Sequence, residues 1–160
     1  RSNCVTGVQT CALPIYGDPD SSTGEVIENL TFRNVDILEH DEDDPMYQGC
    51  MTVDCGDRNR VRNVLFEDIR VEHIQEGRLF YVKVRFNPKY DRQPGSSIEG
   101  VVFRNITYTG VGENRSLIQG LSRDGMVRNV TFENVIINGE KMRDLKEAVT
   151  NEFISNVSVK

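Results

Sequence analysis

The sequence lacks three features that would place it in other classes of protein. It has no surplus of basic side chains, because 19 Lys and Arg residues against 25 Asp and Glu give a formal charge of -6. Binding to a phosphate backbone needs such a surplus, so nucleic acid is not expected as a partner. It has no run of 18 apolar residues, so a membrane is not expected as a partner either. Its first residues lack the basic segment, apolar stretch and small-residue cleavage site of a targeting signal.

What the chain does have is an internal repeat, within 160 residues that are 38% hydrophobic and long enough for one domain with a core. Four segments align without gaps and a fifth copy begins at Ile154; the four are Ile27–Ile37, Val61–Val71, Ile98–Tyr108 and Val127–Ile137. Their shared aromatic residues are 34, 37 and 29 residues apart; these are Phe32, Phe66, Phe103 and Phe132. A nearly constant period with loops of varying length is typical of a solenoid.

Each copy of the repeat has the alternation of a β-strand, with a change of phase inside it. In the first copy, Leu30, Phe32, Val35 and Ile37 are expected to face one side. Asn or Asp recurs at the change of phase, as Asn34, Asp68, Asn105 and Asn134. A second set recurs earlier in the copies, as Asn29, Asn63 and Asn129, with Gly100 in one copy. These residue types tolerate a left-handed backbone and hydrogen-bond along a stack, so each copy is predicted to be two short strands joined by a bend.

A further strand is predicted between successive copies, at Cys50–Cys55, Leu79–Phe86 and Ser116–Leu121. Three short strands per repeat predict an all-β fold, a right-handed parallel β-helix in which each coil pairs with its neighbours. A leucine-rich repeat would need shorter and more uniform periods. A β-sandwich stays open as an alternative, although it would not explain why one eleven-residue text recurs.

The phrases "VRNVTFENVIING" and "IEGVVFRNITYTG" resemble the C-terminal coils of polygalacturonase-like glycoside hydrolases of the family 28 type. The resemblance covers residues 25–139 and implies a secreted or periplasmic parent protein that needs no cofactor. Pectate lyases, family 49 dextranase-like hydrolases and phage tailspikes also use such coils, so the fold does not fix the function.

The family places three aspartates, two of them paired, a Gly-His-Gly and an Arg-Ile-Lys on consecutive coils of one sheet. The Gly-His-Gly position corresponds to Tyr47–Cys50, "YQGC", which has no histidine. The paired aspartates would precede Glu25. The Arg-Ile-Lys position corresponds to Lys83, Val84 and Arg85, where the two cations stand in reversed order.

The residues around this last position form the candidate site. If Val82, Val84 and Phe86 pack inward, then Tyr81, Lys83 and Arg85 point outward together. Stacked coils would bring Asp54, the candidate catalytic residue, near Lys83 and Arg85, with Gln119 on the next coil. The two cations could hold a sugar carboxylate and Tyr81 could stack on a sugar ring. The alternative is a surface ladder of opposite charges between coils, which contributes little to stability.

A second candidate is the acidic loop "HDEDDPMYQG", which contains His40, Asp41, Asp43 and Asp44. It could supply a carboxylate pair or calcium ligands. It lacks the glycine-punctuated alternation of an EF-hand loop, and acidic loops are commonly just solvated, so no metal is predicted.

The opening of the chain differs from the rest. Residues 1–15 show neither the asparagine positions nor the alternation of the repeat, and "VTGVQTCALPI" resembles one reading frame of a sequencing-library adapter. Residues 1–15 are therefore predicted to be foreign, and residues 16–160 to be the C-terminal coils of an N-terminally truncated β-helix; an ordinary N-terminal cap is the alternative. Of the four cysteines, Cys50 and Cys55 then remain, and no disulfide is expected because they would face opposite sides of one strand.

The sequence thus predicts part of a carbohydrate-active protein, a glycoside hydrolase acting on pectic or other acidic polysaccharide, with the 160-residue piece itself inactive. The alternatives are a non-catalytic polysaccharide-binding or structural module and a family 49 dextranase-like hydrolase. The expected partner is a polysaccharide or oligosaccharide.

Overall fold

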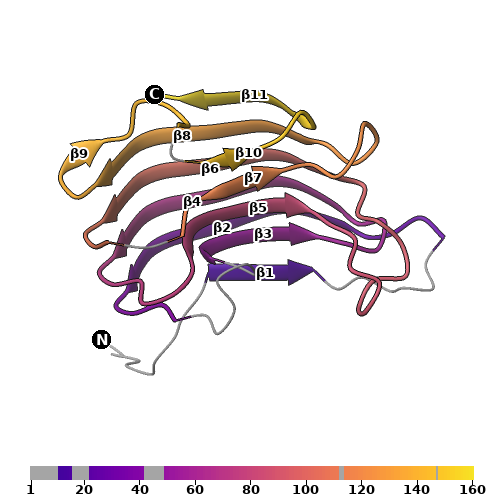
Figure 1. The fold of residues 1–160 in the computed structure, drawn as a ribbon, viewed down its shortest axis with the longest axis horizontal. Coiled ribbons are helices and arrows are strands. Elements are labelled where there is room, and N and C mark those ends of the chain that lie inside the picture. Colours follow the sequence, from indigo (N-terminus) through magenta and orange to yellow (C-terminus); the bar gives the residue numbers. More distant parts are fainter. Residues whose placement is uncertain (1–10, 16–21, 42–48, 112–113, 147) are drawn as a thin grey trace.

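The structure is a computed structural model that describes residues 11–15, 22–41, 49–111, 114–146 and 148–160. These residues form two sheets of mainly parallel strands (Figure 1). No helix long and apolar enough to cross a membrane occurs among them. The predicted all-β class is therefore confirmed.

The first sheet takes alternate strands of the chain. Its order is β1 (Cys11–Ile15), β3 (Gly49–Cys55), β5 (Arg78–Val84), β7 (Leu117–Gln119) and β10 (Val149–Thr150). All of its pairings are parallel. The strands predicted between the repeat copies are thus confirmed, with shorter bounds for the second and third.

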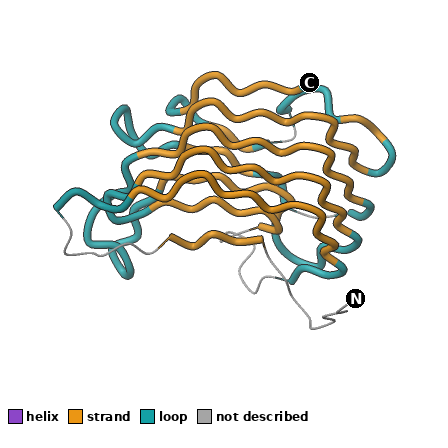
Figure 2. The backbone as a smooth tube through the Cα atoms, turned by 180° about the vertical axis from the view of Figure 1, so that it is seen from behind, coloured by secondary structure: helices purple, strands orange, loops and turns teal. Residues whose placement is uncertain are grey.

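The second sheet takes the repeat copies themselves. Its order is β11 (Ile154–Val159), β8 (Val127–Ile137), β6 (Ser97–Tyr108), β4 (Arg60–Val71) and β2 (Val26–Ile37), and β9 (Glu140–Lys141) pairs with β8 in the antiparallel direction. Figure 2 shows these long strands stacked one above another with loops at both ends. The chain therefore passes from one sheet to the other and back in each period.

Residues that align between the repeat copies are the residues that pair in register in the second sheet. Phe32 pairs with Phe66, Phe66 with Phe103 and Phe103 with Phe132. The rings stack with their centroids 5.0 to 5.1 Å apart. Offset-stacked aromatic pairs stabilise a core beyond their buried area. Phe80 of β5 packs against this column from the first sheet, with its ring centroid 4.6 Å from that of Phe103.

The asparagine positions are the bends of the second sheet. Every Asn or Asp of the two recurring sets has a positive φ between 53° and 60°, and Gly100 has φ 70°. Their side chains form ladders along the stack, in which Asn105 donates to Asp68 at 2.9 Å and Asn134 donates to Asn105 at 2.9 Å. The predicted bends are confirmed, but each copy stays one continuous strand because the ladder continues through them.

Burial follows the alternation inside the stack and weakens at its edge. Phe66 and Phe103 are fully buried, whereas Leu30, Phe32 and Val35 of the edge strand β2 are only partly buried. The core of a coil is buried when a strand packs on each side of it. Among the described residues β2 has a neighbouring strand on one side only, so its apolar side chains stay partly exposed.

The structure bears on the predictions about the cysteines and about the opening segment. Cys50 and Cys55 are both free and buried, although the sequence pattern placed them on opposite sides of one strand. Cys11–Ile15 forms β1, which pairs with β3 from Cys11 opposite Met51 to Ile15 opposite Cys55. A strand therefore exists within residues 1–15, which the sequence pattern did not predict. The foreign origin of this segment stays a prediction.

Candidate functional site

The candidate residues form a row across three neighbouring strands of the first sheet. Asp54 of β3 is paired in register with Lys83 of β5, and Lys83 with Gln119 of β7. Residues paired in register on parallel strands present their side chains on the same face. Lys83 and Gln119 are partly exposed and Asp54 is only 4% exposed. The predicted proximity of Asp54, Lys83 and Gln119 is confirmed.

Arg85 lies directly after β5 and continues the pairing with β3, because its backbone nitrogen donates to the carbonyl of Cys55 at 2.9 Å. Its guanidinium Nε lies 2.7 Å from Asp54 Oδ2 and its Nη2 lies 3.5 Å from Asp91 Oδ1. All three side chains are at most 10% exposed. We call Asp54, Arg85 and Asp91 the buried charge cluster.

The loop between β5 and β6 holds Asp91 in place. The carboxylate Oδ2 of Asp91 accepts a hydrogen bond from the backbone nitrogen of Asn87 at 2.6 Å, and the backbone nitrogen of Asp91 donates to the carbonyl of Asn87 at 2.7 Å. Gly56 leaves the space that the carboxylate fills, because a Cβ there would lie 2.7 Å from Asp91 Oδ1. The neighbouring Asp57 fixes the other end of the loop by accepting from the backbone nitrogens of Arg92 and Gln93.

Burial controls the protonation of Asp54. Loss of hydration, helped by the Asp91 charge and opposed by the Arg85 charge, raises the pKa of Asp54 to about 6. Asp54 is therefore half protonated in mildly acidic solution, where an ordinary aspartate is ionised. Burial also raises the pKa of the Cys55 thiol to about 12, so this cysteine is a neutral core residue rather than a nucleophile.

Three predictions about side-chain direction need correction. Phe86 was expected to pack inward, but it is 44% exposed because β5 ends at Val84. Tyr81 was expected on an open face, but it is 3% exposed and has no room to stack on a sugar ring in this conformation. Arg85 was expected to present a free cation, but it is 8% exposed and held between two carboxylates.

The surface ladder of charges considered as an alternative exists on the other sheet. On the outer face of the second sheet, Glu67 of β4 contacts Arg33 of β2 and Arg104 of β6, and Arg104 also contacts Glu133 of β8. These arginine side chains are 59% and 39% exposed. The Asp54–Arg85 pair also joins neighbouring coils, but it is buried rather than on the surface.

Only the first residues of the second candidate, the acidic loop, are described by the structure. His40 is fully buried, its backbone nitrogen donates to the carbonyl of His73 at 2.9 Å, and burial lowers its pKa. Neither ring nitrogen of His40 has a hydrogen-bond partner in the described part of the chain. Asp41 is partly exposed, and Asp43 and Asp44 lie outside the described residues.

Sequence reasoning missed Asp91 and Gly56. Asp91 lies in a loop that belongs to no repeat copy, so neither register nor periodicity relates it to Asp54. No grouping of three or more His, Cys, Asp or Glu side chains suited to a metal ion occurs among the residues with described positions. The arrangement can donate a proton from Asp54 and attract an anion to Lys83.

Comparison with known proteins gives no relative from which a role could be transferred. No protein-family model matches the chain, and no curated protein or solved structure matches it.

Proposed function

We propose that the two sheets are coils of a right-handed parallel β-helix belonging to a polygalacturonase-like carbohydrate-active protein that acts on pectic or other acidic polysaccharide. The observation that carries the proposal is the row of Asp54, Lys83 and Gln119, in which a carboxyl group with a pKa of about 6 lies beside a partly exposed cation.

The β-helix is supported by the path of the chain between the sheets. Parallel neighbours in each sheet are two elements apart along the chain, or three for β7–β10 and β8–β11, and the connection between them passes through the other sheet. Crossover connections between parallel strands of one sheet are right-handed in about 98% of cases. The stacked phenylalanines and the asparagine ladders repeat once per coil, as a solenoid requires.

A glycoside hydrolase is supported by the protonation of Asp54. Glycosidic cleavage needs a carboxylic acid that donates a proton to the leaving oxygen, and such an acid needs a raised pKa. Lys83 lies in register with Asp54 and is partly exposed, so it can pair with the carboxylate of an acidic sugar. Gln119 adds an amide that can hydrogen-bond sugar hydroxyls.

A non-catalytic polysaccharide-binding module is the second candidate, and the burial of the charge cluster favours it. The carboxylates of Asp54 and Asp91 both face the Arg85 guanidinium and are at most 5% exposed, so they are engaged with a shared partner rather than with solvent. In such a module, Lys83 and Gln119 bind the sugar and no bond is cleaved.

Binding and cleavage of polygalacturonate separate the two candidates. In calorimetric titrations with oligogalacturonate, Lys83→Gln should weaken binding by about 1 to 3 kcal/mol, the range for losing a charged hydrogen bond. The matched control is Arg62→Gln, which removes one cation from the outer face of the second sheet, where Arg62 contacts Glu28. This control should leave the affinity unchanged.

Release of reducing sugar by the whole protein to which these coils belong, measured from pH 4 to pH 8, decides the catalytic role. A hydrolase with Asp54 as the acid should lose activity as the pH rises through about 6, and Asp54→Asn should abolish it. Saccharide binding without release of sugar would identify the binding module. An absence of binding and of cleavage on acidic polysaccharide would refute the proposal.

A further inference from the structure

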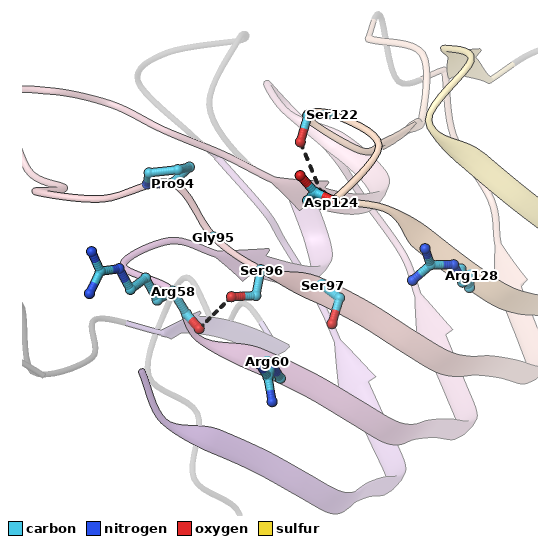
Figure 3. Close-up of a pocket in the computed structure, with 10 residues that line it drawn as sticks. Arg58, Arg60, Pro94, Gly95, Ser96, Ser97, Ser122, Asp124 and Arg128 are labelled. Atoms are coloured by element: carbon cyan, nitrogen blue, oxygen red, sulfur yellow. Dashed lines mark hydrogen bonds between the residues drawn. The ribbon is translucent and has the colours of Figure 1, made fainter. Parts of the chain in front are cut away.

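A pocket of about 430 Å³ lies beside the connections that lead from strands of the first sheet into strands of the second (Figure 3). Its lining comes from three successive passages of the chain from the first sheet into the second. Arg58 and Arg60 come from the passage into β4, Ser96 and Ser97 from that into β6, and Asp124 and Arg128 from that into β8. None of these residues belongs to the row on the first sheet.

The pocket is basic although the protein is acidic. Its lining contains three guanidinium groups and one carboxylate, in a chain whose formal charge is -6. Arg58 donates to the backbone carbonyl of Ser22 at 2.9 Å. Arg60 and Arg128 have neither an ion pair nor a side-chain hydrogen bond with any residue that the structure describes, and both are at least partly exposed.

The other arginines of the second sheet are paired with carboxylates. Arg33, Arg62, Arg70 and Arg104 each contact a Glu or Asp of an adjacent strand. Arg60 and Arg128 therefore lack the carboxylate contact that the other arginines make, although Glu99 of β6 lies in register with Arg128. A guanidinium with unused donors binds carboxylate, sulfate or phosphate in bidentate fashion.

The spacing of the two arginines favours an extended ligand over a small ion. Ser97 lies opposite Arg60 in register, and β6 lies between β4 and β8. Because neighbouring strands are about 4.8 Å apart, the strands of Arg60 and Arg128 are separated by roughly 10 Å. Figure 3 shows Ser97 between these two arginines, with the guanidinium of Arg128 extended toward it. Ser97 lies two residues before Glu99, the register partner of Arg128, so the first cation, the hydroxyl and the second cation run obliquely across the three strands.

We propose that this pocket binds a short stretch of an acidic oligosaccharide, with carboxylates of separate sugars on Arg60 and Arg128 and a sugar hydroxyl on Ser97. The choice of ligand rests on the proposed function, since a polymer that carries a carboxylate on successive sugars matches a repeated cation. Asp124, which also lines the pocket, opposes the negative charge of the ligand and limits its affinity.

The test is titration of the intact chain with trigalacturonate, with neutral maltotriose and inorganic phosphate as comparison probes. The double variant Arg60→Gln/Arg128→Gln should bind trigalacturonate at this site at least tenfold more weakly than the unaltered chain. The control Arg33→Gln/Arg62→Gln removes the same charge from the outer face of the second sheet and should change the affinity less than twofold. Asp124→Asn should strengthen binding two- to threefold, which loss of folding could not do.

Stoichiometry distinguishes this pocket from the row on the first sheet. The unaltered chain should bind two molecules of trigalacturonate, the Arg60→Gln/Arg128→Gln variant one, and Lys83→Gln the other one. If the unaltered chain binds one molecule, and binding is lost in Arg60→Gln/Arg128→Gln but kept in Lys83→Gln, the proposed function is refuted and the pocket is supported. Equal affinities of the double variant and its control for trigalacturonate would refute the proposed role of the pocket. Phosphate binding as tightly as trigalacturonate would also refute it.

Discussion

The two sheets carry similar charged pairs between neighbouring strands, yet the pairs differ in burial. On the second sheet, Arg104 contacts Glu67 and Glu133 with its side chain 39% exposed. On the first sheet, Arg85 contacts Asp54 and Asp91 with its side chain 10% exposed. Ion pairs in water contribute little because solvent screens the attraction, whereas buried ion pairs make each partner depend on the other.

The difference in burial arises from the segments that connect the strands. The outward-facing residues of the second sheet are exposed or partly exposed along its strands. In the first sheet, β5 leads into the loop that carries Asp91, and this loop returns beside the end of β3. The loop thus changes a surface pair into a buried charge cluster and shifts the pKa of Asp54.

The largest effect is expected when the shared cation of the buried charge cluster is removed. Arg85→Met should lower the free energy of unfolding by about 3 to 5 kcal/mol at neutral pH, because it leaves two buried carboxylates without their partner. Arg104→Met removes the equivalent shared cation from the second sheet, and its loss should be several-fold smaller. Urea denaturation of both variants measures the difference, and equal losses would contradict the comparison.

A second, smaller effect should appear in the pH dependence of stability. The folded protein binds a proton at Asp54 more tightly than the unfolded chain, so the stability due to this group falls as pH rises from its usual pKa of 3.8 to about 6. Asp54→Asn removes that titration. Its stability relative to the unaltered protein should therefore rise between these pH values, on the order of 3 kcal/mol in all.

Asp36→Asn on the second sheet is the control with the opposite sign. The hydrogen bond from Arg70 lowers the pKa of Asp36, so its contribution is present at neutral pH and is lost as pH falls below 3.8. The stability of Asp36→Asn relative to the unaltered protein should therefore change only at these lower pH values. A change between pH 4 and pH 6 in this control would assign the titration to another group.

The smallest effect concerns a backbone difference between the two sheets. The second sheet bends at residues with positive φ, whereas no described residue of β3, β5, β7 or β10 has a positive φ. Asn105→Ala in the second sheet should lower the free energy of unfolding by about 1 kcal/mol, because alanine is disfavoured in a left-handed backbone. Asn105→Gly should lose less, since glycine adopts φ 53° without strain. Thr107→Ala, on the same exposed face of β6, is the matched control and should be close to neutral; an equal loss there would refute the backbone explanation.

The repeat by itself determined the larger part of the fold. Alternation specified which residues of each copy are buried, and the aligned copies specified the register that stacks Phe32, Phe66 and Phe103. Recurring asparagines specified the bends, because few residue types tolerate a left-handed backbone. These features were predictable because they recur at a nearly constant spacing along the sequence.

The candidate site was predictable only where it follows that same register. Asp54, Lys83 and Gln119 come together because they occupy equivalent positions on successive strands. The burial of Tyr81 and Arg85, the partnership of Arg85 with Asp91 and the exposure of Phe86 were decided by the tertiary structure. Those outcomes depend on where the loop after β5 folds back and where β5 ends, and a loop outside the repeat has no period from which its position could be read.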